Sequence, residues 1–304
     1  MVMYVMRVLI HTKELVDLRA YYTLQFSLYR CANPLFGEDY HDKFDPEAYL
    51  QMYYADHTDP VQGFITKQLH KFYQSYKSTE AKLKILDIGT GPVIARAISA
   101  APNASKIVLS EYVEASREAL LQWLKNDPKA HDWTPIFKYI VVDLEGKSEE
   151  EVPIRAELLR KVIKAVVSCD VHSDPPIPTQ YVDQYDIVTE FLCLPAACAT
   201  KEEYIAALFR LCALVKPGGT ILLCEGEGKE VPTRTSYLVG SQNFSDLVFP
   251  KEFISTMLKQ AGFCDVKVVS LGKHNFQTMA DETNRVGSAN LGFNFITACK
   301  KSGL

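Results

Sequence analysis

Blocks of apolar residues alternate with amphipathic stretches from residue 84 onward. Short apolar runs bounded by turn residues predict buried strands at 84–89, 106–111, 137–143, 164–169, 185–191 and 220–225. Helical periodicity occupies most of the stretches between them, for example 114–125 and 202–215. Strands that alternate with helices predict a mainly parallel sheet covered on both faces, which is the doubly wound α/β class.

Two other segments depart from this alternation. Residues 265–271 and 292–300 predict strands with no helix between them, so we expect an antiparallel pair that closes the sheet. Residues 45–76 have the pattern of two aromatic-rich helices, the first with Asp45 as N-cap and Pro46 in its first turn. We therefore expect a helical cap at 40–80 and an α/β core at 81–304, preceded by an extension of unknown role at 1–39.

Composition narrows the classes of partner. The 304 residues carry a net charge of −4, mixed along the chain, so a nucleic-acid backbone is not an expected partner. No apolar run approaches the roughly 20 residues of a membrane-spanning helix. None of the eight cysteines forms a C-x-x-C pair, which argues against a zinc site or a disulfide framework. Reduced thiols favour a cytoplasmic protein, and we expect a monomer that binds a small molecule and no metal.

The most informative motif is the turn D-I-G-T-G-P at 87–92, which follows an apolar strand. The next predicted strand ends in an acid, Glu111. Glycines let backbone N–H groups approach a nucleotide-type ligand, and an acid in this place accepts from ribose hydroxyls. Taken alone the turn is also compatible with a purely structural role. Pro92 directly follows the second glycine and removes an N–H donor where a helix N-terminus would hold a pyrophosphate, which speaks against a nicotinamide-dinucleotide oxidoreductase.

A second motif, V-K-P-G-G-T-I-L-L-C-E at 215–225, places a sharp turn before a buried strand. On its own, this motif is also explained as an ordinary connection from a helix to a strand. Together with D-I-G-T-G, however, it resembles the S-adenosylmethionine-dependent methyltransferases of the doubly wound class. That resemblance implies a Rossmann-like, mostly parallel seven-stranded sheet with an antiparallel C-terminal strand. It also implies S-adenosylmethionine as cofactor and S-adenosylhomocysteine as product.

The resemblance then narrows to one family. Segments similar to the nicotinamide, phenylethanolamine, indolethylamine and thioether methyltransferase family are F-D-P-E-A-Y-L-Q-M-Y-Y (44–54), W-L-K-N-D-P-K-A-H-D-W-T-P (123–135), V-V-D-L-E-G (141–146), L-C-L-P-A-A (192–197), S-Y-L-V-G (236–240) and T-M-A (278–280). They are collinear over 40–304, and the pattern is most similar to the nicotinamide type.

For the cofactor, the family pattern implies Tyr49 and Tyr54 at the methionine end, although a plain core helix also explains both. The remaining implied cofactor contacts are Gly89, Thr90 and Gly91 through the backbone, Glu111 on the ribose, Tyr112 and Ser116 beside the adenosine, and Asp170 and Val171 on the adenine. Asp143 is a rival acid that spacing alone does not separate from Asp170.

For the methyl acceptor, the implied contacts are Phe191, Leu192, Tyr237, Glu225 and Asp246. Leu192 and Tyr237 are placed to sandwich a flat ring. Glu225 matches an acidic position that faces the carboxamide in nicotinamide-methylating members, although it also fits the start of a solvated loop. Asp246 stands where those members carry a hydroxyl. No residue is assigned as a certain catalytic group; Tyr54, Glu225 and Tyr237 are expected to position the reactants.

The sequence departs from the family pattern at two places that affect the expected methyl acceptor. Pro195 replaces an acid that the phenylethanolamine type uses near the amine, and the loop 226–235 is longer than in the nicotinamide type. Glu190 and Glu227 are nearby acids that can substitute. The favoured acceptor is the pyridine nitrogen of nicotinamide, which needs no general base. The alternatives are an arylalkylamine acceptor of the phenylethanolamine or tryptamine kind and a non-catalytic homologue that only binds the cofactor.

Overall fold

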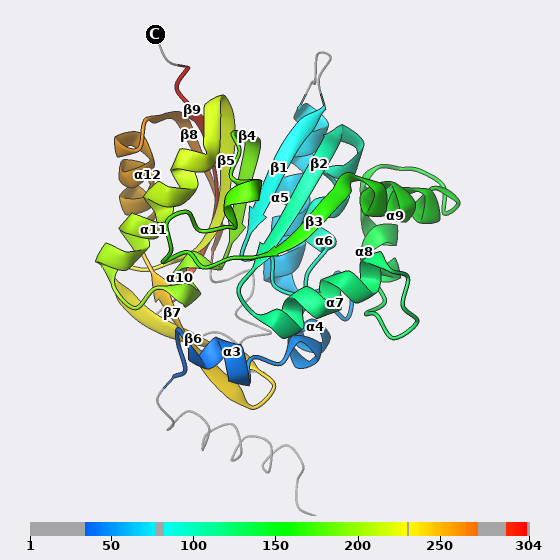
Figure 1. The fold of residues 1–304 in the computed structure, drawn as a ribbon, viewed down its shortest axis with the longest axis horizontal. Coiled ribbons are helices and arrows are strands. Elements are labelled where there is room, and N and C mark those ends of the chain that lie inside the picture. Colours follow the sequence, from blue (N-terminus) through cyan, green and yellow to red (C-terminus); the bar gives the residue numbers. More distant parts are fainter. Residues whose placement is uncertain (1–33, 77–81, 230, 273–289, 303–304) are drawn as a thin grey trace, which may run out of the picture. The chain divides into compact units, whose positions relative to one another are not determined.

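The computed structural model describes residues 34–76, 82–229, 231–272 and 290–302. Seven strands of this part form one sheet in the order β3-β2-β1-β4-β5-β9-β8 (Figure 1). The strands are β1 (Leu83–Ile88), β2 (Ala104–Glu111), β3 (Ile163–Ser168), β4 (Tyr185–Phe191), β5 (Val215–Glu227), β8 (Phe263–Gly272) and β9 (Gly292–Lys300). The predicted seven-stranded doubly wound sheet is confirmed.

The direction of the strands places a switch point at the centre of the sheet. The pairs β1–β2, β2–β3, β1–β4 and β4–β5 are parallel, whereas β9 is antiparallel to both β5 and β8. The chain moves outward from β1 in one direction through β2 and β3, and then in the other through β4 and β5. Open α/β sheets bind ligands beyond the carboxyl ends of the strands at such a point. The antiparallel strand β9 also agrees with the prediction.

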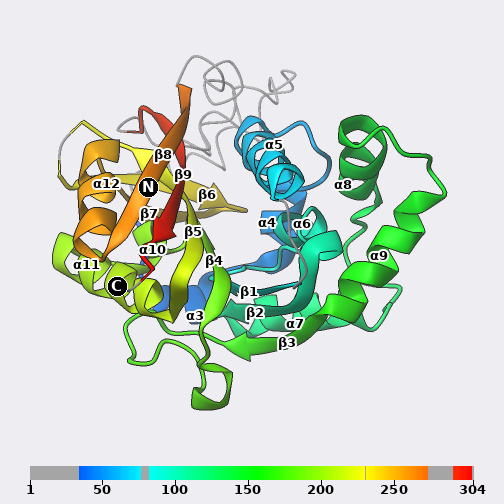
Figure 2. The same ribbon diagram turned by 90° about the horizontal axis from the view of Figure 1, so that it is seen from above.

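Two apolar cores lie on opposite faces of the sheet, as the alternation of side chains along a buried strand requires. In β1, Leu83 and Ile85 belong to one core, while Leu86 and Ile88 belong to the other. The first core includes side chains of α4, α5, α6, α7 and α9, and the second includes those of α11 and α12 (Figure 2). The helices are α3 (Asp39–Lys43), α4 (Pro46–Tyr53), α5 (Pro60–Ser75), α6 (Ala95–Ile98), α7 (Glu114–Leu124), α8 (Thr134–Lys138), α9 (Glu151–Val162), α10 (Leu194–Ala197), α11 (Lys201–Leu214) and α12 (Lys251–Gln260).

The strand predicted at 137–143 is wrong. Helix α8 covers its start, and a π-helix at Tyr139–Leu144 covers the rest. Phe137, Ile140 and Val141 are buried three and four residues apart, which is the spacing of one helix face. Pro135 in the first turn of α8 also favours a helix. A short apolar run does not by itself distinguish a buried strand from a buried helical segment.

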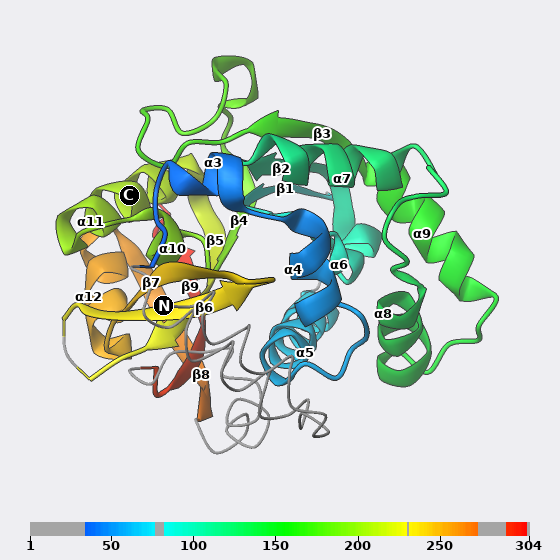
Figure 3. The same cartoon turned by 90° about the horizontal axis from the view of Figure 1, so that it is seen from below.

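A hairpin that the sequence analysis did not predict lies over the carboxyl edge of the sheet. Its strands β6 (Thr233–Val239) and β7 (Gln242–Val248) pair in antiparallel fashion and form a separate two-stranded sheet. Figure 3 shows the hairpin beside α3 and α4. The hydroxyl of Tyr53 in α4 donates to the carbonyl oxygen of Leu238 in β6 at 2.8 Å. Cap and hairpin are therefore joined across the region in which the sheet presents its strand ends.

Candidate active site

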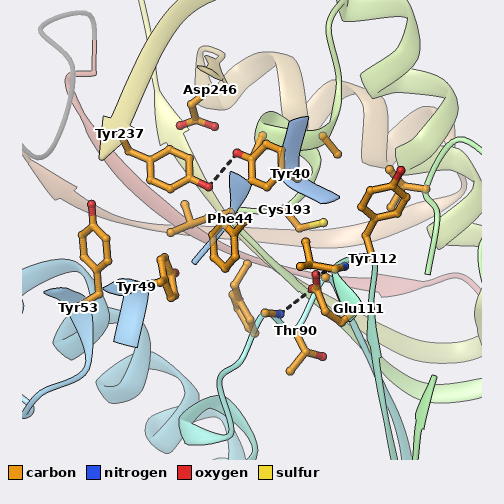
Figure 4. Close-up of a pocket in the computed structure, with 18 of the residues that line it drawn as sticks. Tyr40, Phe44, Tyr49, Tyr53, Thr90, Glu111, Tyr112, Cys193, Tyr237 and Asp246 are labelled. Carbon is orange, nitrogen blue, oxygen red and sulfur yellow. Dashed lines mark hydrogen bonds between the residues drawn. The ribbon is translucent and has the colours of Figure 1, made fainter. Parts of the chain in front are cut away.

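A cavity of about 440 Å³ lies at the carboxyl ends of β1, β2 and β4, beneath α3, α4 and the β6–β7 hairpin. Its walls combine backbone from the glycine turn with side chains from the cap and the hairpin (Figure 4). A volume of this size falls in the range of small-molecule and cofactor sites, roughly 300–1,000 Å³.

The glycine turn after β1 forms the floor at one end of the cavity. Gly89 and Gly91 have φ angles of +62° and +64°, which side chains disfavour. A Cβ atom at Gly89 would lie 2.1 Å from the Sγ atom of Cys193, so this position has no room for a side chain. The turn is also pinned to β2, since the Thr90 N–H donates to the Ser110 carbonyl oxygen at 3.0 Å. The backbone therefore presents itself to the cavity in a fixed conformation.

Glu111, the last residue of β2, fixes the other side of this turn. One carboxylate oxygen accepts from the Gly91 N–H at 2.8 Å (Figure 4). The other accepts from the Val113 N–H, also at 2.8 Å. Burial raises the pKa of Glu111, and the two N–H donors oppose that effect. Each carboxylate oxygen accepts more than one hydrogen bond. The carboxylate thus both braces the turn and keeps acceptor capacity for the hydroxyl groups of a ligand.

Aromatic side chains form the opposite end of the cavity. The hydroxyls of Tyr40 in α3 and Tyr237 in β6 lie 2.8 Å apart and share a hydrogen bond. The rings of Phe44 and Tyr49 also line the wall, with centroids 5.4 Å apart. Asp45 caps α4 by accepting from two backbone N–H groups, as predicted, and this fixes the entry of the helix that carries Tyr49. This end can enclose a flat ring and exclude water from it.

Three buried carboxyl groups lie at or behind the aromatic end. Asp246 of β7 lines the cavity, and its Oδ1 atom has no hydrogen-bond partner among the described residues. Glu190 and Glu225 interact with each other behind the wall, and Glu225 also accepts from the Tyr204 hydroxyl at 2.9 Å. Burial, together with the charge of Glu190, raises the pKa of Asp246 to about 8. Burial and the neighbouring Glu190 also raise the pKa of Glu225 well above its usual range.

Most of the predicted site residues meet in this one cavity. Those that line it are Tyr49, Gly89, Thr90, Gly91, Glu111, Tyr112, Asp170, Val171, Phe191, Leu192, Tyr237 and Asp246. Tyr54, Ser116 and Glu225 are buried but do not line it. The ligand contacts assigned to all of these residues stay predictions.

Some lining residues were missed by the sequence analysis. Tyr40, Phe44, Arg96, Cys193 and Asn290 line the cavity without having been singled out. Tyr40 and Phe44 are four residues apart, an aromatic spacing that pointed to one helical face. Arg96 and Asn290 lie outside every motif, and no signal in the chain marked them.

The described ranges hold neither a metal-binding cluster nor a membrane-spanning helix. No group of three or more His, Cys, Asp or Glu side chains there is arranged to hold a metal ion. Among the described helices, none has both the length and the apolar character needed to cross a membrane.

The switch-point cavity, the glycine turn and the acid at the end of the second strand define a class: the doubly wound, class I methyltransferases that use S-adenosylmethionine. Solved structures agree on the fold. Magnesium protoporphyrin IX methyltransferase from Synechocystis, with bound cofactor, superposes with a TM-score of 0.52 at 12% identity, covering 91% of this chain and 97% of the other. An O-methyltransferase family protein from Burkholderia thailandensis has the same TM-score of 0.52, covering 94% and 71% at 12% identity.

Sequence comparison gives the family. The model of the NNMT/PNMT/TEMT family matches residues 33–292. Mouse indolethylamine N-methyltransferase is 34% identical over 76% of this chain and 85% of its own length. Human nicotinamide N-methyltransferase is 33% identical over 74% and 84%. The rabbit indolethylamine enzyme is 31% identical over 88% and 97%. The chain belongs to the NNMT/PNMT/TEMT family and is an S-adenosylmethionine-dependent N-methyltransferase.

The residues present fit this cofactor. Its ribose offers two hydroxyl donors, which suit the spare acceptor capacity of the Glu111 carboxylate. Close approach to a nucleoside requires backbone without side chains, which Gly89 and Gly91 supply. The aromatic end of the cavity suits the uncharged part of an acceptor better than it suits water.

Proposed function

We propose that this enzyme methylates the nitrogen of a small aromatic molecule, which binds at the aromatic end of the cavity while S-adenosylmethionine binds over the glycine turn. The observation that supports the proposal is the continuity of the cavity. Residues from both ends, such as Gly91 and Tyr237, line the same 440 Å³ space. A methyl donor and an acceptor held there are enclosed together, as a direct transfer requires.

We place the cofactor by the contacts that its chemistry needs. Asp170 and Val171 follow β3 and line the cavity, so we assign them to the adenine. Glu111 takes the ribose hydroxyls, and Tyr49 lies toward the methionine end. Tyr112 is exposed and lines the same side, in keeping with a place beside the adenosine. Ser116 does not line the cavity, and a contact from its hydroxyl requires a local shift of α7.

The cofactor supplies an electrophilic methyl group bound to a sulfonium sulfur. The protein's contribution is then position and exclusion of water. Reacting atoms held at roughly 3–3.5 Å and in line gain most of the advantage of an intramolecular reaction. Leu192 has a φ of +63°, a strained conformation that fixes its backbone at the cavity, and both Leu192 and Tyr237 line this space. We assign these two residues to the faces of the acceptor ring.

The two candidate acceptors, nicotinamide and an arylalkylamine, differ in whether their nitrogen must lose a proton before methylation. The pyridine nitrogen of nicotinamide carries a free lone pair at neutral pH and needs no base. An arylalkylamine nitrogen, with a pKa of about 10 like that of lysine, must first lose a proton. Asp246 supports the second candidate, because the ionised fraction of a cavity carboxyl with its pKa raised to about 8 grows as the pH approaches 8, and that fraction can accept the proton of a bound ammonium group. Glu225, which we expected near a carboxamide, is separated from the cavity and bonded to Tyr204.

We infer a cytoplasmic monomer, and we expect no nucleic-acid partner because the charge of −4 is mixed along the chain. The cysteines among the described residues are free thiols, which suits a reducing compartment. We also keep the division into an extension at 1–39, a cap at 40–80 and a core at 81–304.

The test is an acceptor panel read by mass spectrometry. The full chain is incubated with methyl-labelled cofactor and with nicotinamide, phenylethanolamine or tryptamine, and a reaction without acceptor is the blank. We expect labelled product from at least one compound and none from the blank. S-adenosylhomocysteine binding without product from any acceptor would favour the non-catalytic alternative. Failure to bind S-adenosylhomocysteine at millimolar concentration would overturn the proposal.

A further inference from the structure

Arg96 is a buried cation in the wall of the cavity. Its side chain belongs to α6, which follows the glycine turn, and the residue is only 8% exposed. Nη1 donates to the carbonyl oxygen of Phe191 at 3.2 Å, and Nη2 donates to the hydroxyl of Tyr54 at 3.3 Å. Nε is buried and has no hydrogen-bond partner among the described residues. Both identified partners are neutral groups, so neither balances the charge of the guanidinium.

No carboxylate in the described part of the chain lies within 4.0 Å of this guanidinium. Asp87 and Glu190 act on Arg96 from farther away, and burial raises the pKa of both carboxyl groups, which weakens them as counterions. A guanidinium stays protonated in proteins, and burying it without an anion costs several kcal/mol. Buried charges are normally paired, and no described residue supplies a directly paired anion for Arg96.

The position of Arg96 in the cavity wall indicates which anion it can bind. Three segments around the cavity meet at this side chain: the glycine turn through α6, the end of β4 through Phe191, and the end of α4 through its C-cap residue Tyr54. The Arg96 Cζ atom lies 5.5 Å from the centroid of the Phe191 ring. Tyr54 in turn donates to the Oε1 atom of Gln62, another residue of the cavity wall. The guanidinium is therefore held between the glycine turn and the aromatic wall that carries Tyr49, where the family pattern assigns the methionine part of the cofactor.

We propose that Arg96 binds the α-carboxylate of the cofactor's methionine part, with Tyr54 and the Phe191 carbonyl holding the guanidinium in position for it. The inference rests on the proposed function, and it adds a charged contact that the tyrosines do not provide. That carboxylate is the single anionic group of S-adenosylmethionine, so it is the one part of the ligand that a lone buried cation recognises. Hydrogen bonds between ionised partners are stronger than those from a neutral hydroxyl.

Removing the carboxylate from the ligand separates this role from a general effect on the pocket. Isothermal titration calorimetry on the full chain compares S-adenosylhomocysteine with its decarboxylated analogue, S-adenosyl-3-thiopropylamine. The wild-type protein should prefer the first ligand by about 10- to 100-fold, the range expected for a hydrogen bond to a charged group. In Arg96→Gln the affinity for S-adenosylhomocysteine should fall by a similar factor, while that for the analogue changes by less than about 3-fold.

Two further variants control for folding and for charge. Arg96→Lys keeps a cation without the planar fork and should restore part of the preference. Arg160→Gln removes an arginine that stacks on Trp123 away from the cavity, and it should leave both affinities unchanged. Melting of each variant without ligand establishes that it is folded.

Equal affinity of the wild-type protein for the two ligands would overturn the inference even if no variant folds. An equal loss of both affinities in Arg96→Gln would also overturn it, since that pattern belongs to a structural role. A change confined to the acceptor's KM would assign Arg96 to an acceptor anion instead and refute the inference. If the wild-type protein binds neither ligand, the proposed function fails as well, and that result is distinct from the others.

Discussion

The two ends of the cavity are built in different ways. At the cofactor end, the turn and the acid that braces it lie within residues 89–111, and backbone N–H groups hold the acid. At the acceptor end, α3, the β6–β7 hairpin and Asn290 come from distant parts of the chain, and side chains meet side chains. The cofactor end is thus set by local backbone geometry, and the acceptor end by tertiary packing. The cofactor end suits one unchanging ligand. At the acceptor end, a few substitutions are enough to change which acceptor binds.

The carboxyl groups at the two ends also differ in how their charged forms are stabilised. Glu111 accepts two backbone N–H bonds, which stabilise its charged form against burial. Asp246 is buried and has Glu190 as an electrostatic neighbour, and both effects raise its pKa to about 8, so its neutral form is favoured up to that pH. An acid at the cofactor end serves as a fixed acceptor, and the acid at the acceptor end is able to exchange a proton.

The largest effect is expected from Glu111→Ala. The substitution removes the acceptor of the Gly91 and Val113 N–H groups and the predicted ribose contact. We expect the affinity for S-adenosylhomocysteine to fall by about 100-fold, roughly 3 kcal/mol for two hydrogen bonds to a charged group. Calorimetry measures this loss. Wild-type affinity in the variant would contradict the assignment of the cofactor end, and a matched change at the exposed Glu114 should have no effect.

Asp246→Asn should change the acceptor end while leaving cofactor affinity intact. The acceptor's KM should rise by about 10-fold, because the variant can neither take a proton nor carry charge. Steady-state kinetics with the best acceptor of the panel measures this change. A loss of cofactor affinity of the same size would remove the distinction between the two ends.

The same variant should also alter the pH dependence of stability. The folded protein keeps a proton on Asp246 up to a pH of about 8, whereas the unfolded chain loses it near 3.8. The folded state therefore binds more protons in this window, and the free energy of unfolding falls as the pH rises through it. Asparagine does not titrate, so its advantage should grow from pH 4 to pH 8 and reach about 2 kcal/mol or more, since a tenfold change in proton affinity is worth about 1.4 kcal/mol. Urea titrations across this range measure it, and parallel curves for both proteins would contradict the raised pKa.

The smallest effect is expected from the Tyr40–Tyr237 hydrogen bond. Tyr237→Phe keeps the ring that faces the acceptor and removes one hydroxyl of the pair. We expect a cost of about 1 kcal/mol, seen as a few-fold increase in the acceptor's KM. Tyr40→Phe should have a similar effect, and the double variant should cost little more than either, which marks direct coupling. Additive losses would mean that the two hydroxyls act independently.

The contrast between the two ends also explains what the sequence could predict. The glycine turn and Glu111 could be predicted, because a positive φ and a close approach require glycine, and an acid follows at the end of the next strand. These residue types all lie within a short stretch of sequence. Arg96 and Asn290 were not readable, since their roles depend on which neighbours the fold brings to them. The strand predicted at 137–143 was wrong, because over so short a run the apolar residues fit both the period of a strand and that of a helix. The β6–β7 hairpin was missed within a region that showed only a polar loop and the tyrosine motif.

The place of β9 has a consequence for synthesis of the protein. This strand lies between β5 and β8, yet it is the last strand along the described chain. Until residues 292–300 have left the ribosome, the facing edges of β5 and β8 have no partner. Unpaired strand edges readily join other chains. A polypeptide released early by a stop codon before Gly292 should therefore aggregate instead of persisting as a smaller enzyme.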